Sequence, residues 1–136
     1  MKRKVYYYDT DCGGVVYHAN YLNFFEEART QILEDIGFPA TQLMAMNCFF
    51  VVHHQEIFYK APAFYGDVLD IEARTVEVSP VRMEIEYTIT NQHGKITTTG
   101  STSLVCIGKD GRPHTWPEEF IKKLPIFPKT LKAGRK

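Results

Sequence analysis

A single run of helix-type periodicity in an otherwise β-rich chain is the feature that most constrains the fold. Between residues 20 and 36, apolar side chains recur at steps of three and four, namely at Leu22, Phe25, Ala28, Ile32, Leu33 and Ile36. This spacing lines one face of an α-helix. Asn20 is a candidate cap, Gly37 supplies the usual stop, and Phe24 widens the apolar stripe. We therefore expect one long helix that is buried against a sheet over much of its circumference.

Four later segments have the composition and spacing of β-strands. They are rich in β-branched and aromatic side chains and are separated by turn residues: 49–59, 68–78, 81–89 and 96–107. The third segment alternates apolar and polar residues, as a half-buried antiparallel strand does. Residues 5–8 read as a fifth, aromatic strand, and residues 117–124 as a short terminal helix. One long helix with five strands predicts an α+β domain in which an antiparallel sheet wraps around a central helix.

Three local features refine this fold. The segment 68–78 changes its apolar phase near Arg74 and Thr75, where a bulge would restore the alternation. Residues 91–94 predict a hairpin turn. Gly100, among Thr and Ser residues, would let the helix approach the last strand closely.

The length and the cysteine content fit one domain in a reducing compartment. The 136 residues suit a single domain, which we place at residues 1–128, followed by a basic tail at 129–136 that we expect to be disordered. Cys12, Cys48 and Cys106 are odd in number and lack paired spacing, which disfavours disulfides and zinc sites. No signal region and no run near the roughly 20 apolar residues of a membrane span is visible. We expect a cytoplasmic protein without a transmembrane segment.

The charge distribution disfavours nucleic acid as a partner. The formal net charge is zero, and six of the 16 basic residues lie between residues 122 and 136, which contain no acids. Residues 1–121 thus carry 10 basic against 16 acidic residues, unlike a basic nucleic-acid-binding domain. The basic end could attract an acidic carrier protein or an anionic membrane surface, although a solvated terminus is the simpler interpretation.

The candidate chemistry concentrates in the loop before the helix. Asp9 and Asp11 stand beside Gly13 and Gly14, just ahead of helix N–H groups that are unpaired and carry partial positive charge. A carboxylate near such donors can attack an acyl group, or activate water against it, while an N–H binds the developing oxyanion. Aspartates in ordinary turns bond local backbone in the same pattern. The spacing alone leaves both interpretations open.

Two longer signatures around this loop resemble those of a known enzyme family. The first is the run Tyr7-x-Asp9-Thr10-Asp11-x-x-Gly14-x-Val16-Tyr17-His18-x-Asn20-Tyr21, continued by Glu26, Glu27 and Arg29, and the second is Ile57-x-Tyr59-x-x-Pro62-Ala63. Together they resemble hotdog-fold acyl-CoA thioesterases of the 4-hydroxybenzoyl-CoA thioesterase type, most of all the bacterial subfamily associated with the Tol-Pal envelope system. The resemblance implies a hotdog fold, with a five-stranded antiparallel sheet wrapped around one long central helix. It also implies hydrolysis of acyl-CoA, or of acyl carrier protein thioesters.

The resemblance assigns roles to particular residues. Asp11 would be the catalytic carboxylate, acting as a nucleophile or as a general base on water, and Asp9 would be structural. The backbone N–H of His18, at the helix start, would polarise the thioester carbonyl, and Tyr7 would line the same pocket. Asn20, Tyr21 and Tyr59 would contact the substrate. Apart from the resemblance, the phosphates of coenzyme A need cations, which Lys60 or Arg82 could supply, although lone exposed basic residues are usually solvated surface. No metal and no separate cofactor is implied, because coenzyme A is part of the substrate, and a pocket shared between subunits implies a homodimer or homotetramer.

Several alternative site assignments are weaker. Cys12 lies beside Asp11, but no residue near it in sequence is placed to form its thiolate. The consecutive His53 and His54 point to opposite faces of a strand and cannot both bind one metal ion. Asn23-x-x-Glu26 resembles a capping box. A helix that began there would leave His18 without its proposed role.

Two alternative functions fit the sequence less well than hydrolysis does. A hotdog dehydratase or hydratase would be expected to carry a His and a carboxylate on the central helix, where this chain has Glu26, Glu27 and Arg29 but no His. A non-catalytic acyl-CoA-binding sensor would be expected to carry a DNA-binding segment, for which the chain has no room. Acyl length, an aromatic or aliphatic preference, and the choice between coenzyme A and a carrier protein stay open.

Overall fold

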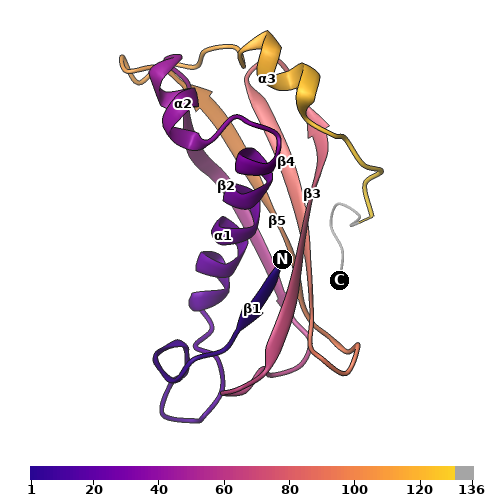
Figure 1. Ribbon diagram of the computed structural model, residues 1–136. Coiled ribbons are helices and arrows are strands. Elements are labelled where there is room, and N and C mark those ends of the chain that lie inside the picture. Colours follow the sequence, from indigo (N-terminus) through magenta and orange to yellow (C-terminus); the bar gives the residue numbers. More distant parts are fainter. Residues whose placement is uncertain (131–136) are drawn as a thin grey trace.

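The computed structural model describes residues 1–130, so most of the expected basic tail lies outside the described residues. In chain order the elements are β1 (Lys2–Lys4), the 3-10 helix η1 (Tyr7–Asp9), α1 (Asn20–Asp35), α2 (Ala40–Ala45), β2 (Phe49–Tyr59), β3 (Val68–Val78), β4 (Arg82–Thr90), β5 (Ile96–Ile107) and α3 (Glu118–Lys123). The long helix α1 runs along one face of the sheet, and α2 and α3 lie at one end of it (Figure 1).

The five strands form one antiparallel sheet in the order β1-β3-β4-β5-β2. The consecutive strands β3, β4 and β5 pair as a meander, and β2 pairs with β5 along its length. The short strand β1 covers only the first residues of β3, where Arg3 lies opposite Leu69. This arrangement confirms the expected α+β hotdog fold with a five-stranded antiparallel sheet around one long helix.

The helix α1 packs closely on the sheet, with Phe25 against β4 and β5. Its buried residues are Tyr21, Phe24, Phe25, Ala28 and Leu33. The ring of Phe25 stacks on that of Tyr87 with centroids 4.0 Å apart and also lies against Gly100, where an added Cβ would come within 2.8 Å of it. Gly100 therefore permits the close approach that the sequence predicts. Leu22 is 41 % exposed, so the buried face is rotated toward Tyr21 and Phe24 relative to the predicted stripe.

The expectation of an N-terminal strand at residues 5–8 is wrong. The strand lies earlier, at Lys2–Lys4, because its backbone pairs with β3. The chain then turns into η1, where the Asp9 carboxylate accepts the Tyr6 N–H at 2.9 Å and the Thr10 N–H donates to the Tyr7 carbonyl at 3.0 Å. The side chains of Tyr7 and Tyr8 are exposed.

The remaining local expectations agree with the structure with few exceptions. The register between β3 and β4 shifts between Thr75 and Glu77, next to the predicted bulge, and Gly94 closes the β4–β5 hairpin with a φ of +80°. The helix α1 begins at Asn20 with Ala19 as its N-cap, so both the expected Asn20 cap and the alternative start at Asn23 are wrong. The helix α2 was not expected.

The last described residues contact the sheet. The Phe127 N–H donates to the Thr75 carbonyl at 2.8 Å, along the part of β3 that β1 leaves uncovered. Lys129 forms an ion pair with Glu77 at 3.2 Å, and Thr130 hydrogen-bonds through its N–H and its hydroxyl to the buried Glu86. The rest of the expected tail, residues 131–136, lies outside the described residues. Within residues 1–130, no helix is both long enough and apolar enough to cross a membrane.

Candidate active site

Asp9 anchors the start of the segment that connects η1 with α1. It is 2 % exposed, and its carboxylate accepts hydrogen bonds from Arg3 Nη1 at 2.8 Å, the Tyr6 N–H at 2.9 Å and Asn20 Nδ2 at 2.9 Å. Burial alone would raise the pKa of Asp9, but these hydrogen bonds together keep the pKa below its ordinary value. The contacts give Asp9 a structural role, as the family resemblance implies.

Asp11 lies in the tight turn that follows and is exposed. Its Oδ1 accepts the Gly13 N–H at 2.8 Å, and its carbonyl accepts the Gly14 N–H at 3.0 Å. Gly14 has a φ of +82°, a conformation that glycine adopts at little cost. Among residues 1–130, no group donates a hydrogen bond to Oδ2 of Asp11. One carboxylate oxygen thus holds the turn, and the other is open to a ligand.

The backbone N–H of His18 is free just before the first turn of α1. Within the described part of the chain it donates to no acceptor. The carbonyl of His18, by contrast, accepts a hydrogen bond from Tyr59 Oη at 2.9 Å, which ties the end of β2 to the helix start. Free N–H groups at the start of a helix bind negatively charged oxygen well, because the helix dipole places partial positive charge there.

An open pocket of about 340 Å³ adjoins this helix start. Its walls are formed by Val15, Val16, His18, Tyr21, Tyr59, Lys60, Ala61 and Pro62. Four of the predicted site residues, His18, Tyr21, Tyr59 and Lys60, thus come together from the two signatures. Tyr21 is buried and its ring meets that of Tyr59 edge-on, with centroids 5.5 Å apart. Burial raises the pKa of Tyr21 despite hydrogen bonds that favour its ionised form.

Sequence reasoning gave no pocket role to four of these wall residues, Val15, Val16, Ala61 and Pro62. The Val16 N–H donates to the Ala63 carbonyl at 2.8 Å, and Val15 pairs with Phe64. The signal for this contact was present, because Val16 belongs to the first signature and Pro62 and Ala63 belong to the second. What the sequence does not show is that the two signatures lie side by side.

The other predicted site residues do not line this pocket. Asp11 is outside its wall, and Tyr7 is 80 % exposed and contacts the ring of Tyr65. The Asn20 side chain bonds to Asp9 and accepts a hydrogen bond from Asn23.

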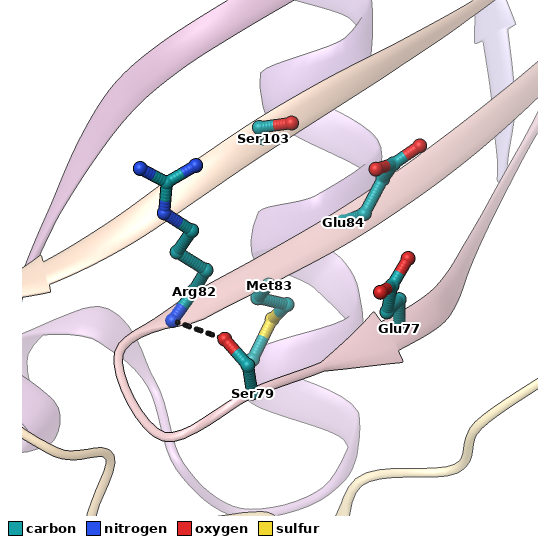
Figure 2. Close-up of a pocket in the computed structure, with 6 residues that line it drawn as sticks. All are labelled: Glu77, Ser79, Arg82, Met83, Glu84 and Ser103. Carbon is teal, nitrogen blue, oxygen red and sulfur yellow. Dashed lines mark hydrogen bonds between the residues drawn. The ribbon is translucent and has the colours of Figure 1, made fainter. Parts of the chain in front are cut away.

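Arg82 lies at the opposite end of the sheet from the pocket. It pairs with Val105, whereas Tyr59 pairs with Thr98. Figure 2 shows Arg82, Glu84 and Ser103 around a separate pocket, where the backbone N–H of Arg82 donates to Ser79 Oγ. Within residues 1–130, no group of three or more His, Cys, Asp or Glu side chains is arranged to hold a metal ion.

Comparisons with known proteins identify the family. A model of the thioesterase-like superfamily matches residues 5–124. The chain is 36 % identical over 119 residues to an acyl-CoA thioester hydrolase, YbgC, of Escherichia coli, which covers 87 % of this chain and 89 % of that protein. It is 37 % identical over 133 residues to the acyl-CoA thioesterase YbgC of Haemophilus influenzae, covering 96 % and 89 %. The crystal structure of a probable thioesterase from Bartonella henselae matches with a TM-score of 0.81 at 36 % identity, over 86 % of this chain and 97 % of that one. The chain therefore belongs to the thioesterase-like superfamily and has its hotdog fold.

Proposed function

We propose that this protein hydrolyses acyl-CoA thioesters at the pocket beside His18, with Asp11 as the reacting carboxylate. The observation that carries this proposal is the free N–H of His18 on the wall of an open pocket, next to the turn that presents Asp11. The Escherichia coli and Haemophilus influenzae relatives are named for the same reaction, which supports this reaction class here.

Two routes would use this arrangement. As a nucleophile, Asp11 would attack the thioester carbonyl carbon, the C–S bond would break with release of the coenzyme A thiolate, and water would hydrolyse the mixed anhydride and regenerate Asp11. As a general base, Asp11 would take a proton from water as the water attacks the same carbon, the C–S bond would break, and the departing coenzyme A thiolate would take up the proton from Asp11. In both routes negative charge develops on the carbonyl oxygen, where the His18 N–H would bind it. A donor of this kind contributes roughly 10²–10³ in rate, or about 3–4 kcal/mol.

The edge of the sheet supports a homodimer. β2 is the last strand in the sheet order, and among residues 1–130 no strand pairs with its outer edge. Val51 and Val52 on this strand are 42 % and 49 % exposed, and an unpaired edge strand with exposed apolar residues favours pairing with another strand. Antiparallel pairing of two β2 strands would bring the Tyr59 end of one copy beside the Phe49 end of the other. Each open pocket would then be closed by its partner, in a dimer or in a tetramer built from such dimers.

Lys60 supports recognition of the charged part of the substrate. It is an exposed cation on the pocket wall, where it would attract the phosphates of coenzyme A or the acidic surface of an acyl carrier protein. Rates of hydrolysis of acyl-CoA and of acyl carrier protein thioesters, compared between Lys60→Ala and wild-type protein, distinguish these two kinds of substrate.

Thiol release from a panel of acyl-CoAs of different acyl length and aromatic character tests the reaction. Asp11→Asn should lower kcat by about 10²–10⁴-fold, because the amide keeps the shape but cannot act as base or nucleophile. Asp110→Asn is a matched control, since Asp110 Oδ1 accepts the Arg112 N–H at 3.0 Å in a similar turn. Equal activity of both variants would contradict the role of Asp11, and a wild type that binds acyl-CoA without releasing thiol would indicate a sensor. Quenched trapping of an acylated Asp11 would separate the two routes.

A further inference from the structure

Both ends of the segment 10–19 are attached to one buried carboxylate. Asp9 immediately precedes this segment, and its Oδ1 accepts a hydrogen bond at 2.9 Å from the Nδ2 of Asn20, which immediately follows it. A backbone hydrogen bond also joins the two ends, because the Tyr17 N–H donates to the Asp9 carbonyl at 3.0 Å. The segment that carries Asp11 and His18 is therefore a closed loop whose ends cannot separate without breaking contacts to Asp9.

Arg3 fixes that carboxylate relative to the rest of the protein. Its Nη1 and Nη2 donate to the two oxygens of Asp9 at 2.8 and 3.2 Å, and its Nε donates to Glu27 on α1 at 2.9 Å. The guanidinium also lies over the ring of Phe24, 4.7 Å from its centroid. One planar group thus joins β1, η1 and α1, and a lysine ammonium cannot reproduce this because it lacks the forked geometry.

The Asp11 half of the segment depends on this attachment more than the His18 half does. The His18 half is also held from outside the segment, by the Val16 N–H on the Ala63 carbonyl and by Tyr59 on the His18 carbonyl. Among the described residues, the hydrogen bonds of Asp11 itself stay within residues 11–15. The Asp11 turn is held on one side by Val15 and Val16, through the Asp11 N–H on the Val15 carbonyl and the bridge between Thr10 and Val16. On the other side its position relative to the helix start is set through Asp9.

We propose that Arg3 and Asn20 are positioning residues, which act through Asp9 to hold the Asp11 carboxylate at a fixed place relative to the His18 N–H. The proposal rests on the proposed function, in which these two groups act on one carbonyl. A misplacement of about 1 Å at a reacting centre can cost about 10²-fold in rate. Because Arg3 and Asn20 act through Asp9 and not on the substrate, loss of either contact lowers kcat and leaves KM nearly unchanged.

We call the contacts of Arg3 and Asn20 with Asp9 the clamp. Arg3→Lys and Asn20→Ala test it, with Arg74→Lys as a matched control. Arg74 has a similarly buried side chain, and it donates to Glu72 at 2.8 Å and to Thr88 at 3.2 Å, both within β3 and β4. With an acyl-CoA that the wild type cleaves, Arg3→Lys and Asn20→Ala should each lower kcat by about 10–100-fold with KM within about threefold. Arg74→Lys should lower the melting temperature comparably and leave kcat unchanged.

Hydrogen exchange gives a readout that does not depend on turnover. Backbone amides of residues 10–19 should exchange faster in Arg3→Lys than in the wild type and in Arg74→Lys, at a temperature where all three are folded. A wild type that releases no thiol would overturn the proposed function, while faster exchange confined to 10–19 would still support the clamp. Unchanged exchange in that segment, or an equal loss of kcat in Arg74→Lys, would overturn the clamp.

Discussion

Gly100→Ala probes how closely α1 packs on the sheet. A Cβ at this position would lie 2.5 Å from the Glu56 carbonyl oxygen of β2 and 2.8 and 2.9 Å from two ring carbons of Phe25. The ring cannot move aside easily, because Phe25 is fully buried and stacked on Tyr87. Relief of the clash therefore requires that both the β2 backbone and α1 shift.

We expect this substitution to lower the free energy of unfolding by about 2 kcal/mol. Overpacking of a close-packed core costs about 1–3 kcal/mol, and contact with a backbone carbonyl places Gly100 at the upper end of that range. The lower chain entropy of unfolded alanine offsets about 0.4–1 kcal/mol. The melting temperature should fall by roughly 6–8 °C for a chain of this length.

Urea unfolding followed by circular dichroism measures this loss, in the wild type and in a Phe25→Leu background. Leucine removes the ring atoms that meet the added Cβ, so Gly100→Ala should cost less in that background. A Gly100→Ala protein as stable as the wild type would refute the packing argument. An equal cost in both backgrounds would assign the clash to the Glu56 carbonyl alone and refute the part that concerns the ring.

Three further substitutions have distinct expected outcomes. Thr99→Val should raise the free energy of unfolding in urea by about 1 kcal/mol, because the buried Thr99 Oγ1 has no hydrogen-bond partner within residues 1–130. Asp9→Asn should cost about 3 kcal/mol at pH 7. Since the folded-state pKa of Asp9 lies below its ordinary 3.8, the wild type should lose this advantage as the pH falls below about 4, and unfolding curves of the two proteins should converge as the pH falls further. Tyr59→Phe removes the hydrogen bond to the His18 carbonyl and should lower kcat about 3–10-fold while stability changes by less than about 1 kcal/mol; unchanged thiol release would argue against a role of this bond in catalysis.

The strands were predictable where composition and turns agree. β2, β3 and β5 have the bounds expected from sequence, because each is a long run of β-branched and aromatic residues that ends at turn residues. The strand β1 could not be found this way, since Lys-Arg-Lys has no strand pattern and is extended only because it pairs with β3. Residues 5–8 have strand composition, but the Asp9 carboxylate accepts a hydrogen bond from the Tyr6 N–H, and the chain turns there.

The candidate site was predictable in part. The sequence names His18, Tyr21, Tyr59 and Lys60 as site residues, and the structure places all four in one pocket. The position of Arg82 depends instead on strand register, which no periodicity reports. The contact of Asn20 with Asp9 could not be predicted either, because it depends on how the loop between them closes.

The order of the strands also bears on when the site forms during folding. β3, β4 and β5 follow one another in the chain and pair as neighbours, whereas β1 and β2 each pair with a strand much later in the sequence. Closing such long loops costs entropy before the contacts compensate, so we expect the meander to form early and the two outer strands to dock late. Arg3 on β1 and Tyr59 on β2 hold the segment 10–19 from two sides. A chain arrested at the meander would thus be partly compact but catalytically silent, because the segment that carries Asp11 would order last.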